Sequence, residues 1–138
     1  MDGLTAAQKL DLMDGEETTV DIRARLEQQA VLCAKTGNDV GLQDALDQEV
    51  YVDCKDEFGN TLLILAGQQG NKKIAKMLLR AGADIHAQND AGCSVLHYCY
   101  EYGKSELAQY LQSKGADDSL LNAEGLTPYE GLKKARIE

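Results

Sequence analysis

The sequence of 138 residues has no tryptophan, one phenylalanine and one proline. No apolar run approaches the roughly 18 residues that a membrane-spanning helix needs, and the longest obvious run covers only residues 62–66. The N-terminus has no basic region followed by an apolar core, which argues against a secretory signal. With 27% charged and 43% hydrophobic residues, the composition is that of one folded domain rather than a disordered segment.

Basic side chains are also in short supply, and the shortage is uneven. The formal net charge is −9; residues 1–55 hold 12 acidic and 5 basic side chains, whereas residues 56–138 hold 11 and 9. An acidic chain repels nucleic-acid phosphates, so direct binding of DNA or RNA is not expected. A protein partner with a basic surface is favoured, although acidity that serves only solubility explains the same charge.

Internal repetition is the feature that the sequence has in abundance. The segment at residues 56–88 recurs 33 residues later. Three positions keep the same type of residue in successive copies: Gly37, Gly70 and Gly103; Gly59, Gly92 and Gly125; Thr61, Ser94 and Thr127. A fixed period near 33 residues indicates stacked units, each unable to bury its apolar face alone. We therefore expect function on a binding surface rather than in a catalytic cleft.

Each full unit predicts a turn followed by two helices. In the unit at residues 56–88, Gly59 suits a turn with positive φ and Thr61 suits the N-cap of the first helix. Gly70 is expected to end the first helix and Gly82 the second. Apolar residues at helical spacing give each helix an inward face.

The period divides the chain into five parts of a single domain. They are an extension at residues 1–22, a divergent repeat at 23–55, full repeats at 56–88 and 89–121, and a C-terminal capping half-repeat at 122–138. In the divergent repeat, Glu49 stands where the full repeats have glycine after the second helix. Its first helix is expected to begin with Thr18 or Thr19 as N-cap and to run to Lys35. Whether residues 1–17 form a short amphipathic helix stays open.

Four cysteines occur, at Cys33, Cys54, Cys93 and Cys99. An even number fits disulfides in a small secreted chain. The repeat favours another interpretation, because Cys99 stands where the preceding copy has Ala66, a small core position. We therefore expect reduced thiols in a cytoplasmic or nuclear protein.

The repeated residues resemble those of the ankyrin-repeat family. The likeness is carried by residues 59–63, Ala66, Gly70 and 78–84 in one copy, by Gly92, Ser94, Leu96, His97, Gly103, 106–107 and 115–117 in the next, and by Thr127 and Pro128 in the last. The proline of the family's Thr-Pro-Leu-His signature is replaced in both full repeats, and its histidine is kept only as His97. The resemblance implies an all-α solenoid of stacked helix-turn-helix units with short β-hairpin loops, called fingers.

The resemblance also implies a function. Members of the family usually bind other proteins through a concave surface formed by the fingers and the first helices. It implies no enzyme activity and no specific partner. We therefore expect a non-enzymatic interaction module, an adaptor, inhibitor or assembly factor, that is monomeric and has no cofactor and no nucleic-acid or membrane partner. Two alternatives stay open: a regulatory subunit or excised domain of a larger enzyme, and an enzyme or metalloprotein in its own right.

Candidate partner-binding residues are the outward positions at the finger tips and at the ends of the first helices. They are Glu57, Phe58, Asn60, Gln68, Gln69, Asp90, Ala91, Cys93, Glu101, Tyr102 and Glu124. Phe58 and Tyr102 stand out because exposed aromatic residues are frequent interface hot spots, unless each folds back onto its neighbours. The acids at the tips, Asp56 among them, either form a negative ridge for a basic partner or are solvated turn residues.

Two other groups of residues invite a functional reading. Cys93, His97 and Cys99 lie close in sequence, but structural zinc needs four ligands and two of these positions serve the repeat. We therefore expect neither a metal site nor Cys–His catalysis there. A basic stripe on the second helix of one repeat fits an acidic partner or an ordinary solvated face; it comprises Lys72, Lys73, Lys76 and Arg80.

Because only two repeats are well formed, the terminal units are expected to contribute packing to the whole array. Deletion of residues 1–35 is therefore predicted to destabilise all the remaining repeats together. Denaturant unfolding followed by circular dichroism measures this effect. Cooperative unfolding of the shortened chain at an unchanged midpoint would contradict the prediction.

Overall fold

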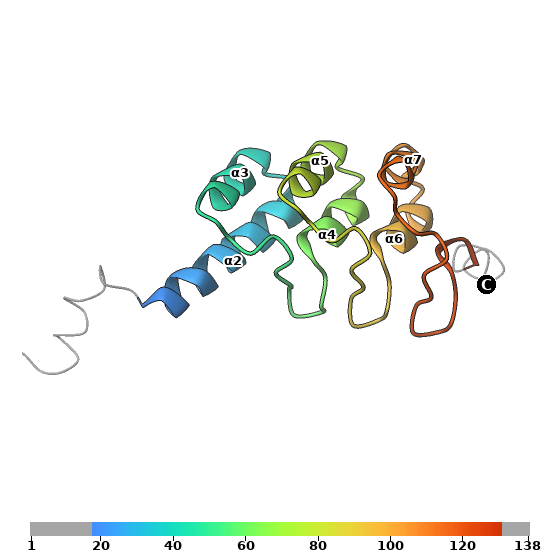
Figure 1. Ribbon diagram of the computed structural model, residues 1–138, viewed down its shortest axis with the longest axis horizontal. Coiled ribbons are helices and arrows are strands. Elements are labelled where there is room, and N and C mark those ends of the chain that lie inside the picture. Colours follow the sequence, from blue (N-terminus) through green and yellow to red (C-terminus); the bar gives the residue numbers. More distant parts are fainter. Residues whose placement is uncertain (1–17, 131–138) are drawn as a thin grey trace, which may run out of the picture.

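The computed structural model describes residues 18–130, and six helices lie wholly within this range. They are α2 (Thr19–Thr36), α3 (Asp39–Asp47), α4 (Leu62–Gln69), α5 (Lys72–Arg80), α6 (Val95–Glu101) and α7 (Ser105–Ser113). Figure 1 shows three helix pairs stacked side by side, an all-α solenoid as the repeat predicts. The open question about residues 1–17, and the part of the capping half-repeat from residue 131 onward, lie outside the described residues.

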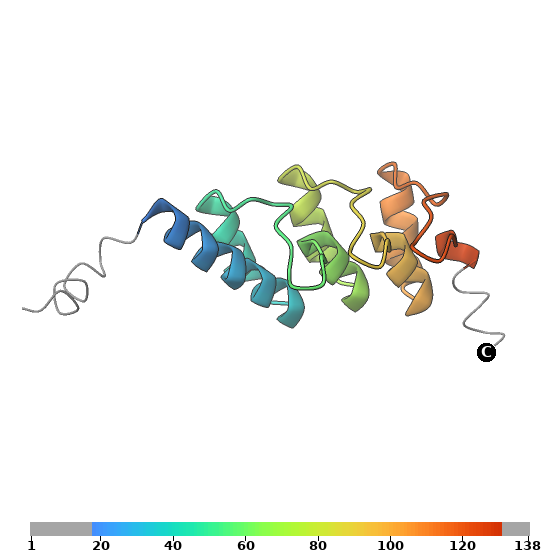
Figure 2. The ribbon, with the colours of Figure 1, turned by 90° about the horizontal axis from the view of Figure 1, so that it is seen from below.

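The helices form two rows. The inner helices α2, α4 and α6 lie next to one another, and the outer helices α3, α5 and α7 form a second row against them (Figures 1 and 2). Three loops project from the same side of the array, and we name them by residues: finger 1 (55–61), finger 2 (88–94) and finger 3 (121–127). No helix within residues 18–130 is both long and apolar enough to cross a bilayer.

Helix ends follow the predicted capping residues. Thr18 Oγ1 accepts a hydrogen bond from Asp21 N–H at 3.1 Å, so the first helix begins as expected and ends one residue beyond the predicted Lys35. Thr61 caps α4 in the same way, by accepting from the Ile64 N–H at 3.2 Å. These side chains satisfy backbone donors that have no partner within the helix.

The core lies between the two rows and along the inner row. α4 is the most enclosed element, with its residues from Leu62 to Gly67 all buried, because it packs against α2 and α6 on its flanks and against α5. Gly67 permits the closest approach: a Cβ at this position would lie 2.4 Å from Val95 Cγ2 of α6. Burial of this kind, at about 25 cal/mol per Å² of apolar surface, is the main favourable term in folding.

The fingers are tight turns rather than extended hairpins. In finger 1, the Gly59 N–H donates to the Asp56 carbonyl at 3.1 Å, and an isolated antiparallel bridge joins Lys55 to Thr61. Within residues 18–130 this bridge belongs to no sheet. The β-hairpin loops implied by the sequence are therefore reduced to their turn and one flanking pair.

Glu49 occupies a backbone conformation that normally requires glycine. Its φ is +64°, and the residues 33 and 66 positions later, Gly82 and Gly115, have φ of +93° and +97°. A side chain in this left-handed region costs roughly 1–2 kcal/mol. The divergent repeat thus keeps the geometry of the full repeats at the expense of local strain.

Substitution Glu49→Gly is predicted to stabilise the protein by up to about 1 kcal/mol, because relief of left-handed strain exceeds the added entropy of the unfolded chain. The matched change Gly82→Ala should destabilise it by about 1 kcal/mol, since φ is +93° there and no atom lies within 4 Å of the added Cβ. Urea unfolding of both variants measures the two shifts. Destabilisation by Glu49→Gly would contradict the strain.

Candidate protein-binding surface

One acceptor side chain at the start of each finger shapes its turn. Asp56 Oδ1 accepts hydrogen bonds from the backbone N–H groups of Phe58 and Asn60, both at 2.9 Å. The same pair of bonds recurs from Ala91 and Cys93 to Asn89 Oδ1, and from Glu124 and Leu126 to Asn122 Oδ1. Asp and Asn stabilise turns through such bonds to the backbone two residues on.

Neighbouring fingers are joined through their backbones. The Asp90 N–H of finger 2 donates to the Phe58 carbonyl of finger 1 at 3.1 Å. The Ala123 N–H of finger 3 donates to the Ala91 carbonyl of finger 2 at 2.9 Å. Finger 2 therefore donates an N–H to the finger that precedes it and offers a carbonyl to the finger that follows. Backbone hydrogen bonds thus join the three fingers in a continuous row.

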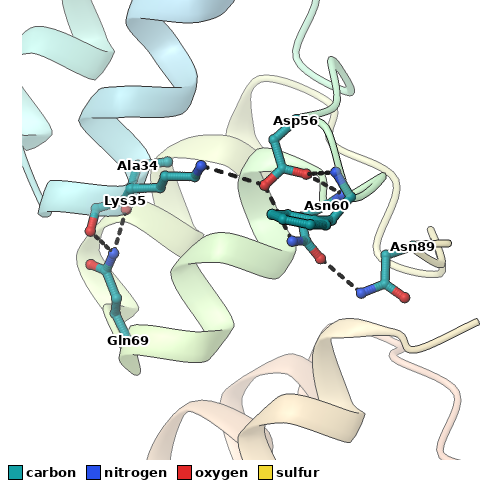
Figure 3. Close-up of polar contacts among 7 residues, drawn as sticks. Ala34, Lys35, Asp56, Asn60, Gln69 and Asn89 are labelled. Atoms are coloured by element: carbon teal, nitrogen blue, oxygen red, sulfur yellow. Dashed lines mark hydrogen bonds and ion pairs between the residues drawn. The ribbon is translucent and has the colours of Figure 1, made fainter. Parts of the chain in front are cut away.

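A chain of polar contacts ties finger 1 to the helices on either side (Figure 3). Lys35 Nζ, at the end of α2, lies 3.7 Å from Asp56 Oδ2, which also accepts from Asn60 Nδ2 at 3.2 Å. Asn60 Oδ1 accepts from Asn89 Nδ2 at 2.7 Å, and the same Asn89 amide group donates to the Tyr98 hydroxyl on α6 at 2.6 Å. The chain runs from α2 to α6 across two fingers.

Further contacts in this region keep the Asp56 carboxylate charged and bind the free carbonyls at the end of α2. Burial raises the pKa of Asp56, but the hydrogen bonds from Asn60 and Phe58 together with the charge of Lys35 outweigh it and leave that pKa below its usual value. The Gln69 side-chain amide on α4 donates to the carbonyls of Ala34 (at 2.8 Å) and Lys35, near the end of α2 (Figure 3). These carbonyls belong to the last turn of a helix and have no partner within it.

Most of the predicted binding residues lie on the surface. Phe58 at the tip of finger 1 is 61% exposed, and Tyr102 at the end of α6 is 53% exposed. The Tyr102 ring stacks on Tyr98, with centroids 6.1 Å apart, so one of its faces is covered. The other exposed members of the predicted set are Glu57, Gln69, Asp90, Ala91, Glu101 and Glu124.

Four predicted positions differ from the expected outward placement. Asn60 is only 6% exposed and serves the contact chain between fingers. Gln68 and Cys93 are half-buried. Asp56, expected among the acids of a negative ridge, has a side chain only 3% exposed and paired with Lys35, so the ridge is limited to the remaining acids.

The basic stripe on α5 is partly neutralised. Lys73 Nζ lies 2.5 Å from Asp39 Oδ2 of α3, and Lys72 Nζ lies 3.4 Å from Glu106 Oε1 of α7. Lys72 and Lys76 also lie 5.3 Å from the centre of the Tyr110 ring on α7. The stripe therefore links three outer helices, which favours the structural interpretation over an acidic partner.

Both ring nitrogens of His97 are used by the fold. Nδ1 accepts from the Ser94 N–H at 3.0 Å, so Nε2 carries the proton and donates to the Leu126 carbonyl of finger 3 at 3.0 Å. Within residues 18–130, no group of three or more His, Cys, Asp or Glu residues is placed to hold a metal ion. Burial raises the pKa of the Cys54 and Cys99 thiols to about 12, which makes them poor nucleophiles.

Stacked helix pairs with laterally bonded fingers define the class of helical repeat solenoids. A family model described as ankyrin repeats (3 copies) matches residues 30–122. The chain therefore belongs to the ankyrin-repeat family, which confirms the resemblance seen in the sequence. Ankyrin repeats are protein-interaction modules, and they are typically non-catalytic.

Similar proteins are mostly much longer than this chain. The E3 ubiquitin-protein ligase Ufd4 of Drosophila melanogaster is 31% identical over 113 residues, which is 81% of this chain and 4% of the ligase. Human protein phosphatase 1 regulatory subunit 27 is 41% identical over 59 residues, 43% of this chain and 38% of that subunit. Human SH3 and multiple ankyrin repeat domains protein 2 is 34% identical over 85 residues, 62% of this chain and 5% of that protein.

The His97 geometry predicts a pH dependence of stability. Burial lowers the pKa of His97, against a smaller opposite effect of the hydrogen bond to Leu126. The unfolded chain therefore binds a proton more readily, and this stabilisation is present above about pH 6.5 and lost as pH falls below it. The unfolding free energy, measured in urea between pH 7.5 and 5, should decrease in that window.

The chain supplies its own control, because it has only two histidines. His97→Gln should flatten the pH profile above pH 5, at the cost of lower stability at pH 7.5. His86→Gln leaves the Ser94–His97–Leu126 contacts in place and should keep the profile. A profile that His86→Gln flattens and His97→Gln leaves steep would overturn the assignment.

Proposed function

We propose that the protein is a non-enzymatic adaptor, inhibitor or assembly factor that binds a protein partner through its fingers and inner helices. The observation that carries the proposal is the hydrogen-bonded finger stack, with Phe58 exposed at the tip of finger 1 and Tyr102 exposed at the end of α6. Because the stack is held by the chain's own contacts, binding costs little ordering entropy. Exposed aromatic residues on such a rigid support are strong candidates for hot spots.

The charge of this surface favours a basic partner. Exposed acids lie at each finger tip and at the end of α6: Glu57, Asp90, Glu101 and Glu124. Opposite charge on the partner would raise its association rate and help to orient it. The acidic net charge of the whole chain acts in the same direction.

A regulatory subunit or excised part of a larger enzyme is the second candidate. It is supported by the similarity to a phosphatase regulatory subunit and by the small fraction of the ligase that this chain covers. Stable co-purification with a catalytic chain distinguishes it from a free adaptor. Both candidates use the same surface and differ only in what the partner does.

Affinity capture from a lysate of the source cell tests the proposal. The wild-type chain is compared with Phe58→Ala/Tyr102→Ala, which removes both exposed aromatic rings. Loss of hot-spot residues costs about 2 kcal/mol or more each, so a specific partner should fall by well over tenfold.

The matched control is Val40→Ala/Tyr51→Ala, which removes two exposed apolar side chains outside the fingers and inner helices. Circular dichroism shows that both double variants remain folded. A partner that the control retains and the aromatic variant loses supports the proposal and can be identified by mass spectrometry. Equal capture by all three chains would place the interface elsewhere.

A further inference from the structure

The first unit of the described array has no finger at the position where the later units have one. By the 33-residue period, a finger ahead of finger 1 would fall at residues 22–28. These residues lie instead within α2, which is 18 residues long where α4 has 8. Within residues 18–130, the first helix pair therefore has no finger of its own, and the side of α2 that corresponds to the finger-facing side of α6 has no finger against it.

Equivalent side chains on the inner helices show the consequence. Tyr98 on α6 contacts finger 2 through Asn89, which identifies its position as the one that faces the preceding finger. The residue 33 positions earlier, Leu65 on α4, is 3% exposed. The next equivalent, Leu32 on α2, is 61% exposed. Within residues 18–130, neither a finger nor a further inner helix lies on this side of α2, and Leu32 is left uncovered.

In the described part of the chain, the backbone of finger 1 also lacks a partner on the side that faces α2. Asp90 and Ala123 each donate an N–H to the preceding finger, and Glu57 is their equivalent in finger 1. Within residues 18–130 the Glu57 N–H makes no hydrogen bond. It lies on the edge that faces α2, where a further carbonyl would continue the ladder.

A hollow of about 600 Å³ lies between this edge and α2. Its apolar part is the exposed side of α2, with Ala24, Val31 and Leu32. Its polar part comes from both elements: Glu27, Gln28, Lys35, Lys55, Asp56 and Glu57. Lys35 and Asp56 are paired with each other, so the charges left to a ligand are those of Glu27, Glu57 and Lys55.

We infer that this hollow, the α2 groove, binds an extended segment of a partner protein in the position of the absent finger. A carbonyl of the segment accepts from the Glu57 N–H and continues the ladder that joins the fingers. An adjacent apolar side chain covers Leu32, and a basic side chain lies near Glu27 and Glu57. The inference rests on the proposed function only in that the occupant is a protein.

The groove favours an extended backbone over a helix. A helix satisfies its own carbonyls and has none to offer to an N–H on its flank. An extended segment keeps a carbonyl free at each residue, as in the addition of a strand to an open edge. Its alternate side chains then point to opposite sides, one toward α2 and the next toward solvent and the acids.

Titration of the ¹⁵N-labelled full chain with the peptide acetyl-Gly-Arg-Leu-Arg-Val-Gly-amide tests the inference by NMR. The amide resonances of Glu57, Val31 and Leu32 should shift together, with the Glu57 N–H moving downfield. Leu32→Asp should weaken binding by about tenfold or more, because it places a charge in the apolar part of the groove. Val40→Asp, an exposed apolar position on α3, is the matched control and should bind as the wild type does.

A pair of changes at one position isolates the backbone donor. Glu57→Pro removes the N–H at the second residue of a turn, where proline is well tolerated, whereas Glu57→Gln removes only the charge. The proline variant should bind at least about fivefold more weakly than the glutamine variant, as loss of one hydrogen bond predicts. Equal affinity of the two variants would overturn the role of this N–H.

The remaining outcomes decide between the α2 groove and other sites. Shifts confined to Phe58 and Tyr102 would overturn the inference. Absence of binding by the wild type would also overturn it, and that is the result expected if residues 1–17 of the same chain, rather than a partner, occupy the groove. The Phe58→Ala/Tyr102→Ala variant should bind this peptide with unchanged affinity. Failure of the peptide to bind, with partner capture still dependent on Phe58 and Tyr102, would leave the proposed function intact.

Discussion

One side chain accepts two backbone N–H groups at Asp56, at Asn89 and at Asn122, and the candidate binding surface depends on this interaction. It fixes the turn of each finger at the base of a helix. Only with that turn fixed can Asp90 and Ala123 reach the carbonyls of the preceding finger. The side-chain bonds form within one finger, but they position the backbone groups that bond to the next finger. Together, the two kinds of bond join three loops into a continuous surface.

The helical core supports this surface through close contacts in the inner row. α4 packs directly against both α2 and α6, and the lack of a side chain at Gly67 lets α6 approach it. The spacing of the inner helices sets the spacing of the fingers, because each finger runs directly into the N-cap of its helix. Packing and finger register are therefore a single constraint, and a change in one is transmitted to the other.

The parts of the fold that depend on local chemistry could be predicted from the sequence. Thr18 and Thr61 predicted the starts of α2 and α4, and the glycines that recur every 33 residues predicted the turns. The placement of Asn60 could not be predicted from its own repeat, because its burial comes from Asn89 of the next finger. Asp56 looked like one more exposed acid for the same reason, since its pairing with Lys35 joins residues that the period does not relate. A repeat pattern relates equivalent positions of successive units, so it does not predict contacts between non-equivalent positions of adjacent units.

The two ends of the described finger stack differ chemically, and this gives the array a direction. At finger 3, the Leu126 carbonyl is held by His97 of the preceding inner helix. At finger 1, the Glu57 N–H faces a hollow rather than another finger. Leu65 on α4 is buried, whereas its equivalent on α2, Leu32, is 61% exposed on the side of the array where finger 1 is the first described finger. Replacement of a preceding finger by the first half of α2 keeps the core closed while it leaves the polar edge of the stack open. An edge of this kind is normally shielded in stable proteins, so an open one is a reason to look for the chain that covers it.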